Sequence, residues 1–143
     1  MGKAANSSIS LKQIHVTDNF WNKYVHLVKD VIIPYQWDIL NDKLEDVETS
    51  HCIENFKIAA GEKEGEFQGA VFQDTDVAKW LEAVGFVLNY ERDEKLEELA
   101  DETIELIGRA QQPDGYLNTY FTIKEPDGRW SNLMEGHELY TAG

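Results

Sequence analysis

Apolar residues recur every three or four positions along much of this chain, most clearly over residues 76–111. Such spacing places apolar side chains on one face of a helix. A first helix begins with Asp76 as its cap, and a second follows the short polar stretch 89–93. The two apolar faces carry Val77, Trp80, Leu81, Val84, Val87 and Leu88, and then Leu96, Leu99, Ala100, Thr103, Ile104 and Ile107. Two amphipathic helices with so short a connection predict an antiparallel αα-hairpin.

A second helical pattern precedes this hairpin. Thr17 and Asp18 are suitable capping residues, and the apolar positions that follow cover most of the helix circumference, which predicts a buried helix. Pro34 should end or kink this helix, and a second piece follows over residues 35–44. Alternating apolar positions over residues 9–16 predict a short strand.

The remaining segments are less regular. Residues 1–8 are small and polar, and we expect them to be disordered. Residues 45–70 read as an exposed loop that contains a short helix over residues 51–60.

The C-terminal third begins with two Pro-Asp-Gly turns, at 113–115 and 126–128. The residues between them are β-prone, so a small β excursion is expected near residues 116–130. Residues 135–142 then read as the opening turns of another helix, within which the chain stops. The pattern predicts a mainly α fold in which residues 1–143 form a single incomplete domain, the N-terminal piece of something larger.

Charge and composition narrow the possible partners. The chain has 143 residues, with 13 basic and 27 acidic side chains and a formal net charge of −14. This charge opposes binding to nucleic acid or to an anionic membrane. No apolar run is long enough for a membrane span, and the first residues lack the apolar stretch of a secretory signal. We therefore expect a cytoplasmic protein whose ligand is neutral or cationic, or is another protein.

The single cysteine, Cys52, excludes an internal disulfide and a metal site built from several thiolates of one chain. His51 precedes it, which invites comparison with a thiol nucleophile and its base. Adjacent helical residues point about 100° apart, so this histidine is poorly placed to activate the thiol. The pattern favours an inert, buried cysteine.

His137 lies in the segment 135–138 (EGHE), which is similar to the start of a zinc-protease motif. That motif needs a second histidine four residues after the first, and this position is Thr141. His137 can instead bind a ligand hydroxyl, with Glu135 or Glu138 fixing its tautomer, or it can be a structural histidine.

Polar side chains just before Trp80 are of the types that bind sugars. The amide of Gln73 and the carboxylates of Asp74 and Asp76 suit sugar hydroxyls, and aromatic rings stack on apolar sugar faces. Helix capping by Asp76, with Asp74 in the turn before it, is the structural alternative. Three aromatic residues downstream also allow two interpretations: they either stack on a bound sugar or simply cover the hairpin. They are Tyr116, Tyr120 and Trp130.

Three stretches together resemble glycoside hydrolase family 127 (GH127), the β-L-arabinofuranosidase-type family. They are 67–83 (FQGAVFQDTDVAKWLEA), 112–121 (QPDGYLNTYF) and 130–140 (WSNLMEGHELY). Two shorter pieces, 20–21 (FW) and 33–36 (IPYQ), look like the first helix of that family. The resemblance covers nearly all of this chain but only the opening part of such a protein.

The resemblance implies an N-terminal fragment of an (α/α)6 toroid, with β-sandwich domains after it. It also implies a retaining glycoside hydrolase that releases β-L-arabinofuranose or a related sugar from oligosaccharides. Members of the family are expected to use a cysteine nucleophile on a zinc ion held by cysteines and a glutamate, with another glutamate as acid/base. Those positions lie beyond Gly143, so the resemblance places no catalytic residue and no metal ligand in this chain.

For this chain the resemblance implies a substrate-binding role alone. His137 matches the position that touches the bound sugar, and Asp74, Asp76 and Trp80 are assigned to the pocket wall. The 143-residue chain is expected to be inactive by itself. Helix faces left without neighbours also predict self-association.

The residues are also compatible with two other functional classes. One is another α/α-toroid sugar enzyme, such as an unsaturated glucuronyl hydrolase or a sugar epimerase, although the net charge of −14 disfavours an acidic substrate. The other is a non-catalytic interaction module.

Overall fold

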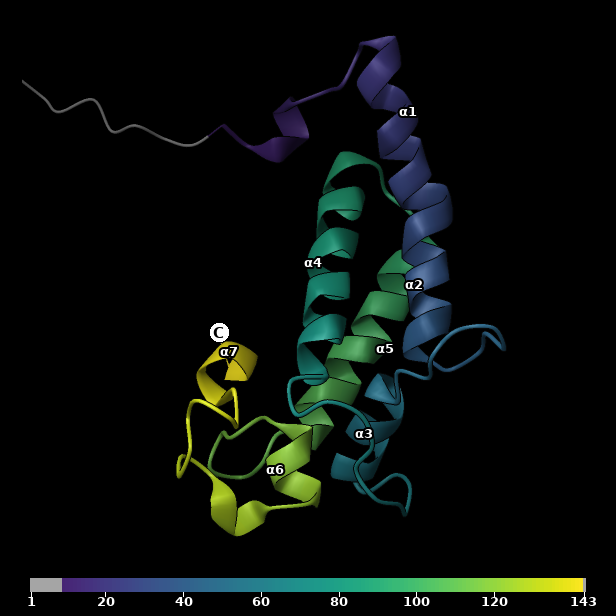
Figure 1. Cartoon of the computed structure of the whole chain (residues 1–143). Coiled ribbons are helices and arrows are strands. Elements are labelled where there is room, and N and C mark those ends of the chain that lie inside the picture. The colour runs from purple at the N-terminus through teal and green to yellow at the C-terminus, as the bar shows by residue number, and fades with distance from the viewer. Residues whose placement is uncertain (1–8, 143) are drawn as a thin grey trace, which may run out of the picture.

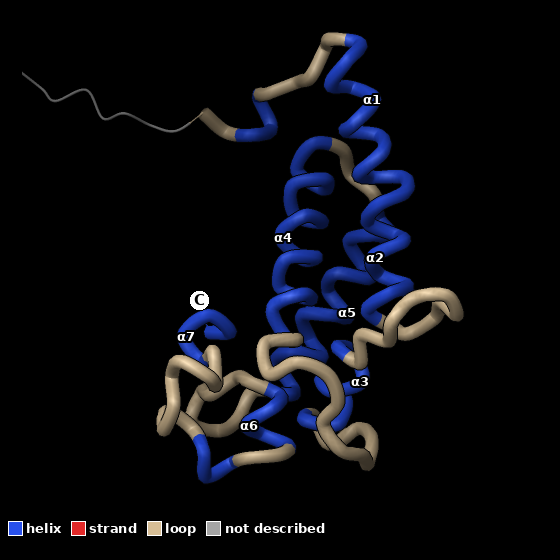
Figure 2. Tube along the Cα trace, in the orientation of Figure 1, coloured by secondary structure: helices blue, strands red, loops and turns tan. Residues whose placement is uncertain are grey.

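The computed structural model describes residues 9–142, which fold into helices and connecting loops without a β-strand. Figure 2 shows this helical composition, and Figure 1 the arrangement of the helices. The mainly α prediction is confirmed, whereas the expected disorder of residues 1–8 lies outside the described part. Within that part, every helix is too short or too polar for a transmembrane span.

The predicted αα-hairpin is present. Helix α4 (Asp74–Tyr90) is followed by α5 (Glu94–Ala110), and the two lie side by side in Figure 1. The carboxylate of Asp93 caps α5 by accepting bonds from the backbone N–H groups of Lys95 and Leu96, both at 3.2 Å. Asp76 does not cap α4 as predicted, because that helix begins two residues earlier and Asp76 lies inside its first turn.

The N-terminal helical segment is continuous through Pro34. Helix α1 (Asn19–Leu27) passes through a π-helical stretch (Val28–Ile32) into α2 (Ile33–Leu40). Asp18 caps α1, as predicted, through Phe20 N at 3.0 Å and Trp21 N at 2.8 Å. Pro34 does not end the helical segment as expected; it directly follows the π-helical stretch, where the regular α-helical hydrogen bonding is already interrupted.

The expected burial of α1 is wrong. Trp21 is 61% exposed, and none of the α1 residues is buried. Figure 1 shows the reason, since α1 extends beyond the end of α4 and has no helix against its outer faces. The strand expected over residues 9–16 is also wrong, because this region contains a 3-10 turn (Leu11–Gln13).

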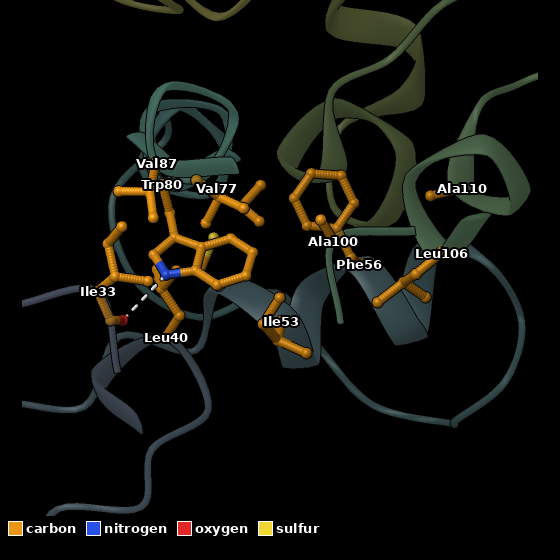
Figure 3. Close-up of a cluster of buried hydrophobic side chains, with 12 residues drawn as sticks. Ile33, Leu40, Ile53, Phe56, Val77, Trp80, Val87, Ala100, Leu106 and Ala110 are labelled. Atoms are coloured by element: carbon orange, nitrogen blue, oxygen red, sulfur yellow. Dashed lines mark hydrogen bonds between the residues drawn. The ribbon is translucent and has the colours of Figure 1, made fainter. Parts of the chain in front are cut away.

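The core lies between α2, α3 (Cys52–Ala59), α4 and α5, where Figure 3 shows its side chains. Helix α3 confirms the short helix expected over residues 51–60. Trp80 is fully enclosed, and its indole N–H donates to the carbonyl oxygen of Ile33 at 3.1 Å. The ring of Trp37 packs against it with a centroid distance of 4.5 Å. This contact joins α2 to α4.

The C-terminal rim, residues 111–142, folds against the start of α4 and contains α6 (Thr119–Ile123), a 3-10 turn (Pro126–Gly128) and α7 (Glu138–Ala142). The expected β excursion near residues 116–130 is therefore wrong. Asn118 caps α6 through Phe121 N at 3.1 Å, and this local cap favours a helical turn over an extended strand.

The first of the two Pro-Asp-Gly turns is confirmed. Gly115 has a φ of +89° and donates its N–H to the carbonyl oxygen of Gln112 at 2.8 Å. The second triplet, 126–128, is a 3-10 turn that does not use the left-handed conformation. Helix α7 begins at Glu138, three residues later than the pattern indicated.

Candidate functional site

A hollow of about 660 Å³ lies beside the first turns of α4. It is bounded by α2, by residues 48–50 and by residues 69–70. Its polar lining includes Gln36, Ser50, Gln73, Asp76 and Lys79. These groups include a carboxylate, two amides, a hydroxyl and an ammonium, which together can pair with several hydroxyl groups of one small polyol.

The polar side chains of the hollow form a connected array. The amide nitrogen of Gln73 donates to Asp76 Oδ2 at 2.9 Å and to Ser50 Oγ at 3.4 Å. Lys79 Nζ lies 3.4 Å from Asp76 Oδ1 and donates to Thr75 Oγ1 at 3.1 Å. All of these residues except Ser50 lie on the first turns of α4 or immediately before it, so the helix holds their spacing.

A second group of side chains stands where the rim meets α4. The exposed imidazole of His137 lies edge-on to the ring of Phe72, with a centroid distance of 5.3 Å. Tyr140 approaches the same Phe72 ring at 6.4 Å. The ammonium of Lys79 lies 5.4 Å from the centroid of the Tyr140 ring. Lys79 therefore belongs to both groups and connects the hollow with the rim.

The contact between Lys79 and Tyr140 also affects their protonation. A side-chain hydrogen bond with Tyr140 raises the pKa of Lys79, which favours the ammonium. The same contact lowers the pKa of the Tyr140 phenol. At neutral pH the edge of the hollow thus carries a cation beside the carboxylate of Asp76.

The predicted partners of His137 are not beside its ring. The carboxylate of Glu138 accepts bonds from Tyr116 and Trp130, and Glu135 lies near Asn132. The expectation that either glutamate fixes the tautomer of His137 is therefore wrong. Within residues 9–142 neither imidazole nitrogen has a hydrogen-bond partner, so both are available to a ligand.

Asp74 is buried and faces the rim, outside the lining of the hollow. Its two carboxylate oxygens accept bonds from the backbone N–H and the hydroxyl of Thr119, both at 2.6 Å. Burial raises the pKa of Asp74, and the two bonds from Thr119 oppose that rise. In this arrangement Asp74 connects α6 to α4. Its contact with a sugar stays a prediction.

The aromatic candidates fall into separate environments. Trp80 borders the hollow, but both its ring and its N–H are engaged in the core. Tyr120 packs edge-on against Phe67 at 5.0 Å and covers the core. Trp130 is 52% exposed and lies edge-on to Tyr116 at 5.3 Å. Only Trp130 among these three offers an open ring surface.

Cys52 is inert in this fold. Its thiol is fully buried and donates to the carbonyl oxygen of Gln73 at 3.2 Å, and burial raises the thiol pKa. His51 instead approaches Asp42, with 3.3 Å between Nδ1 and Oδ2. Across the described residues no three histidine, cysteine, aspartate or glutamate side chains gather as metal ligands. Residues 9–142 therefore offer no ligand set for the zinc ion that the resemblance places further along the family's chain.

Sequence reasoning missed five residues of the site: Gln36, Ser50, Phe72, Lys79 and Tyr140. Lys79 carries a local signal, because it follows Asp76 by three positions on a helix and such pairs interact. Gln36 and Tyr140 have no such signal. They reach α4 only through the packing of α2 and of the rim.

Comparison with known proteins gives one consistent family. The family model for the β-L-arabinofuranosidase GH127 catalytic domain matches residues 13–143. The non-reducing end β-L-arabinofuranosidase of Bifidobacterium longum subsp. longum is 39% identical over 146 residues, which cover 91% of this chain and 22% of that protein.

Two solved structures agree with this match. The crystal structure of a GH127 β-L-arabinofuranosidase from Geobacillus stearothermophilus T6 has 63% identity and a TM-score of 0.88, covering 90% of this chain and 20% of the other. A second GH127 β-arabinofuranosidase has 30% identity and a TM-score of 0.80, covering 93% and 21%. This chain spans about a fifth of the length of these relatives. As its sequence motifs predicted, the chain belongs to the GH127 β-L-arabinofuranosidase catalytic-domain family.

Proposed function

We propose that this chain supplies one wall of the sugar site in a retaining glycoside hydrolase that releases β-L-arabinofuranose or a related sugar from oligosaccharides. The observation that carries the proposal is the meeting of two groups at α4: the polar array of the hollow and the open imidazole of His137. Lys79 contacts both groups. Membership in GH127, whose relatives are named arabinofuranosidases, supports the choice of sugar.

Each side chain of the two groups can make a different kind of contact with a furanose. Asp76 accepts hydrogen bonds from sugar hydroxyls, and Lys79 donates to them. His137 can donate or accept, depending on its tautomer. The ring of Phe72, which is partly exposed beside His137, offers an apolar surface to the sugar C–H groups. This set binds and orients a neutral sugar, but it contains no nucleophile.

The chemical step requires groups that residues 9–142 do not provide. Cys52 is buried with a raised pKa, and the described residues hold no cluster of metal ligands. We therefore place the zinc, its thiolate ligands and the acid/base glutamate of the family mechanism outside residues 9–142. The 143-residue chain by itself should not hydrolyse a glycoside.

The wider expectations also belong to this proposal. The α4–α5 hairpin would be one helix pair of an (α/α)6 toroid. A neutral sugar is compatible with the net charge of −14, and we retain a cytoplasmic location. We expect neither nucleic acid nor a membrane as a partner.

The test uses the full-length protein that carries this chain and p-nitrophenyl β-L-arabinofuranoside as substrate. We expect release of p-nitrophenol, and we expect His137→Ala to lower kcat/KM by about 10- to 100-fold through loss of hydrogen bonds to the sugar. Leu139→Ala is the matched control, because this exposed residue of α7 lies outside the site. Equal activity of the two variants would refute the role of His137. Cleavage of an unsaturated glucuronyl substrate instead would point to another class of toroid enzyme.

A further inference from the structure

Glu138 is a deeply buried carboxylate next to the proposed sugar contact. It is 1% exposed and is the first residue of α7. Its Oε1 accepts a hydrogen bond from the hydroxyl of Tyr116 at 2.5 Å, and its Oε2 accepts one from the backbone N–H of Trp130 at 2.6 Å. One side chain therefore joins three separate parts of the rim.

This carboxylate is costly to bury. Within residues 9–142 it forms no ion pair, and the nearby guanidinium of Arg129 is directed to Asp114 at 3.1 Å while stacking 4.1 Å from the centroid of the Tyr116 ring. A buried charge held only by neutral donors costs stability relative to an apolar side chain of similar volume. Its presence here is more readily explained by the geometry that it imposes than by a gain in stability.

The loop that Glu138 closes is conformationally strained. Trp130 has a φ of +61° and His137 a φ of +49°, values that side-chain-bearing residues seldom adopt. Such conformations persist where the surroundings determine them. Glu138 binds the N–H of Trp130 at one end of the loop and is covalently joined to His137 at the other.

The loop between these two residues has little freedom of its own. Gly136 donates its N–H to the carbonyl oxygen of Asn132 at 2.8 Å. A Cβ at this glycine would lie 2.9 Å from that oxygen and 2.9 Å from the ring of Phe121. The turn before His137 is thus pressed against α6, and Glu138 fixes the remaining side.

We propose that Glu138 is a positioning residue, which closes the loop 130–137 through Tyr116 and Trp130 and thereby holds the imidazole of His137 toward the sugar. This inference rests on the proposed sugar contact of His137. Glu138 itself touches no substrate, because both of its oxygens are directed into the rim. Without its carboxylate, the strained backbone at His137 can relax and the imidazole loses its fixed position.

A double-mutant cycle on kcat/KM in the full-length protein separates positioning from general stability. If Glu138 acts through His137, Glu138→Ala lowers kcat/KM, while the variant with both His137→Ala and Glu138→Ala is no worse than His137→Ala alone. Losses that multiply in the double variant would overturn the proposal. An unchanged kcat/KM in His137→Ala would instead overturn the sugar contact on which it rests.

Two conservative variants keep the test informative if Glu138→Ala does not fold. In Glu138→Gln the amide oxygen can accept from Trp130 N–H and the amide nitrogen can donate to Tyr116, so we expect activity within about threefold of wild type. Tyr116→Phe removes a single donor, and we expect a partial loss that disappears when His137 is already alanine. Tyr24→Phe, on the exposed helix α1, is the matched control. A Glu138→Gln variant as impaired as His137→Ala would contradict positioning by hydrogen bonds.

Discussion

Replacement of Asp74 by asparagine changes the charge of the contact between α4 and the rim while keeping its hydrogen bonds. In the wild type both carboxylate oxygens accept from Thr119, one from its N–H and one from its hydroxyl. In Asp74→Asn the amide oxygen can still accept from the Thr119 N–H, and the amide nitrogen can donate to the Thr119 hydroxyl oxygen. The variant therefore isolates the cost of burying the charge.

That cost depends on pH with a definite sign. Burial raises the pKa of Asp74 above its ordinary value of 3.8 in the folded state, so the unfolded chain releases this proton first as pH rises. The folded state then holds more protons, and the free energy of unfolding falls by up to about 1.4 kcal/mol per pH unit. The fall begins near pH 3.8 and ends at the folded-state pKa.

Urea unfolding of the 143-residue chain, followed by tryptophan fluorescence between pH 3 and pH 8, measures this effect. We expect Asp74→Asn and wild type to be similar at the acidic end, and the variant to become progressively more stable as pH rises before the difference levels off. Asp74→Ala leaves two donors of Thr119 unpaired and should cost about 2–6 kcal/mol. A difference between asparagine and aspartate that is constant, or that shrinks as pH rises, would refute the reasoning.

Three further predictions concern the core, the thiol and the exposed apolar surface. Trp80→Phe removes the hydrogen bond to Ile33 and part of the ring, and should lower the free energy of unfolding by about 1–3 kcal/mol. The control is Phe20→Ser at an exposed position, which should change the free energy of unfolding by under about 0.5 kcal/mol. Equal losses of stability for the two variants in urea titrations would contradict this prediction. Cys52 should react with a thiol reagent only after unfolding, since it is buried, and rapid labelling of the native chain would contradict that. The 143-residue chain should self-associate through the apolar groove of about 550 Å³ beside α1, and Phe86→Glu should reduce the mass seen by light scattering; an unchanged mass would count against this surface.

The sequence predicted well the elements whose stability is local. The α4–α5 hairpin follows from an uninterrupted helical period and from the short polar connection between the two helices. The cap at Asp18 was likewise visible, because an N-cap needs only its own next three residues. The burial of α1 was not predictable in the same way. An apolar face shows that a helix can be buried, but the helices beside it decide whether it is.

The β excursion failed for a different reason. Its β-prone residues form a helical turn, which is stabilised by the Asn118 cap and by a contact with Asp74, 45 positions earlier than Thr119. Strand preference is weak enough for such tertiary contacts to override it. A contact between residues as far apart as Asp74 and Thr119 leaves no signal in the local sequence.

The sequence allowed some residue types of the candidate site to be predicted, but not how their side chains are arranged in space. The sequence singled out Gln73 and Asp76 as side chains of a sugar-binding type, and the structure places both on one hollow; their contact with a sugar stays a prediction. The orientation of Glu138 could not be inferred from the sequence. A carboxylate in the first turn of a short helix ordinarily faces solvent, whereas this one is buried. The contact of Lys79 with Tyr140 likewise depends on how the rim folds back onto α4.

A crystal structure of the full-length protein with bound L-arabinose would test the proposed sugar wall most directly. We expect the sugar where the hollow meets the rim, with a ring nitrogen of His137 and a carboxylate oxygen of Asp76 within hydrogen-bond distance of its hydroxyls. We also expect the carboxylate of Glu138 to remain bound to Tyr116 and Trp130. A sugar held in the active site without any contact to these first turns of α4 or to His137 would contradict the assignment.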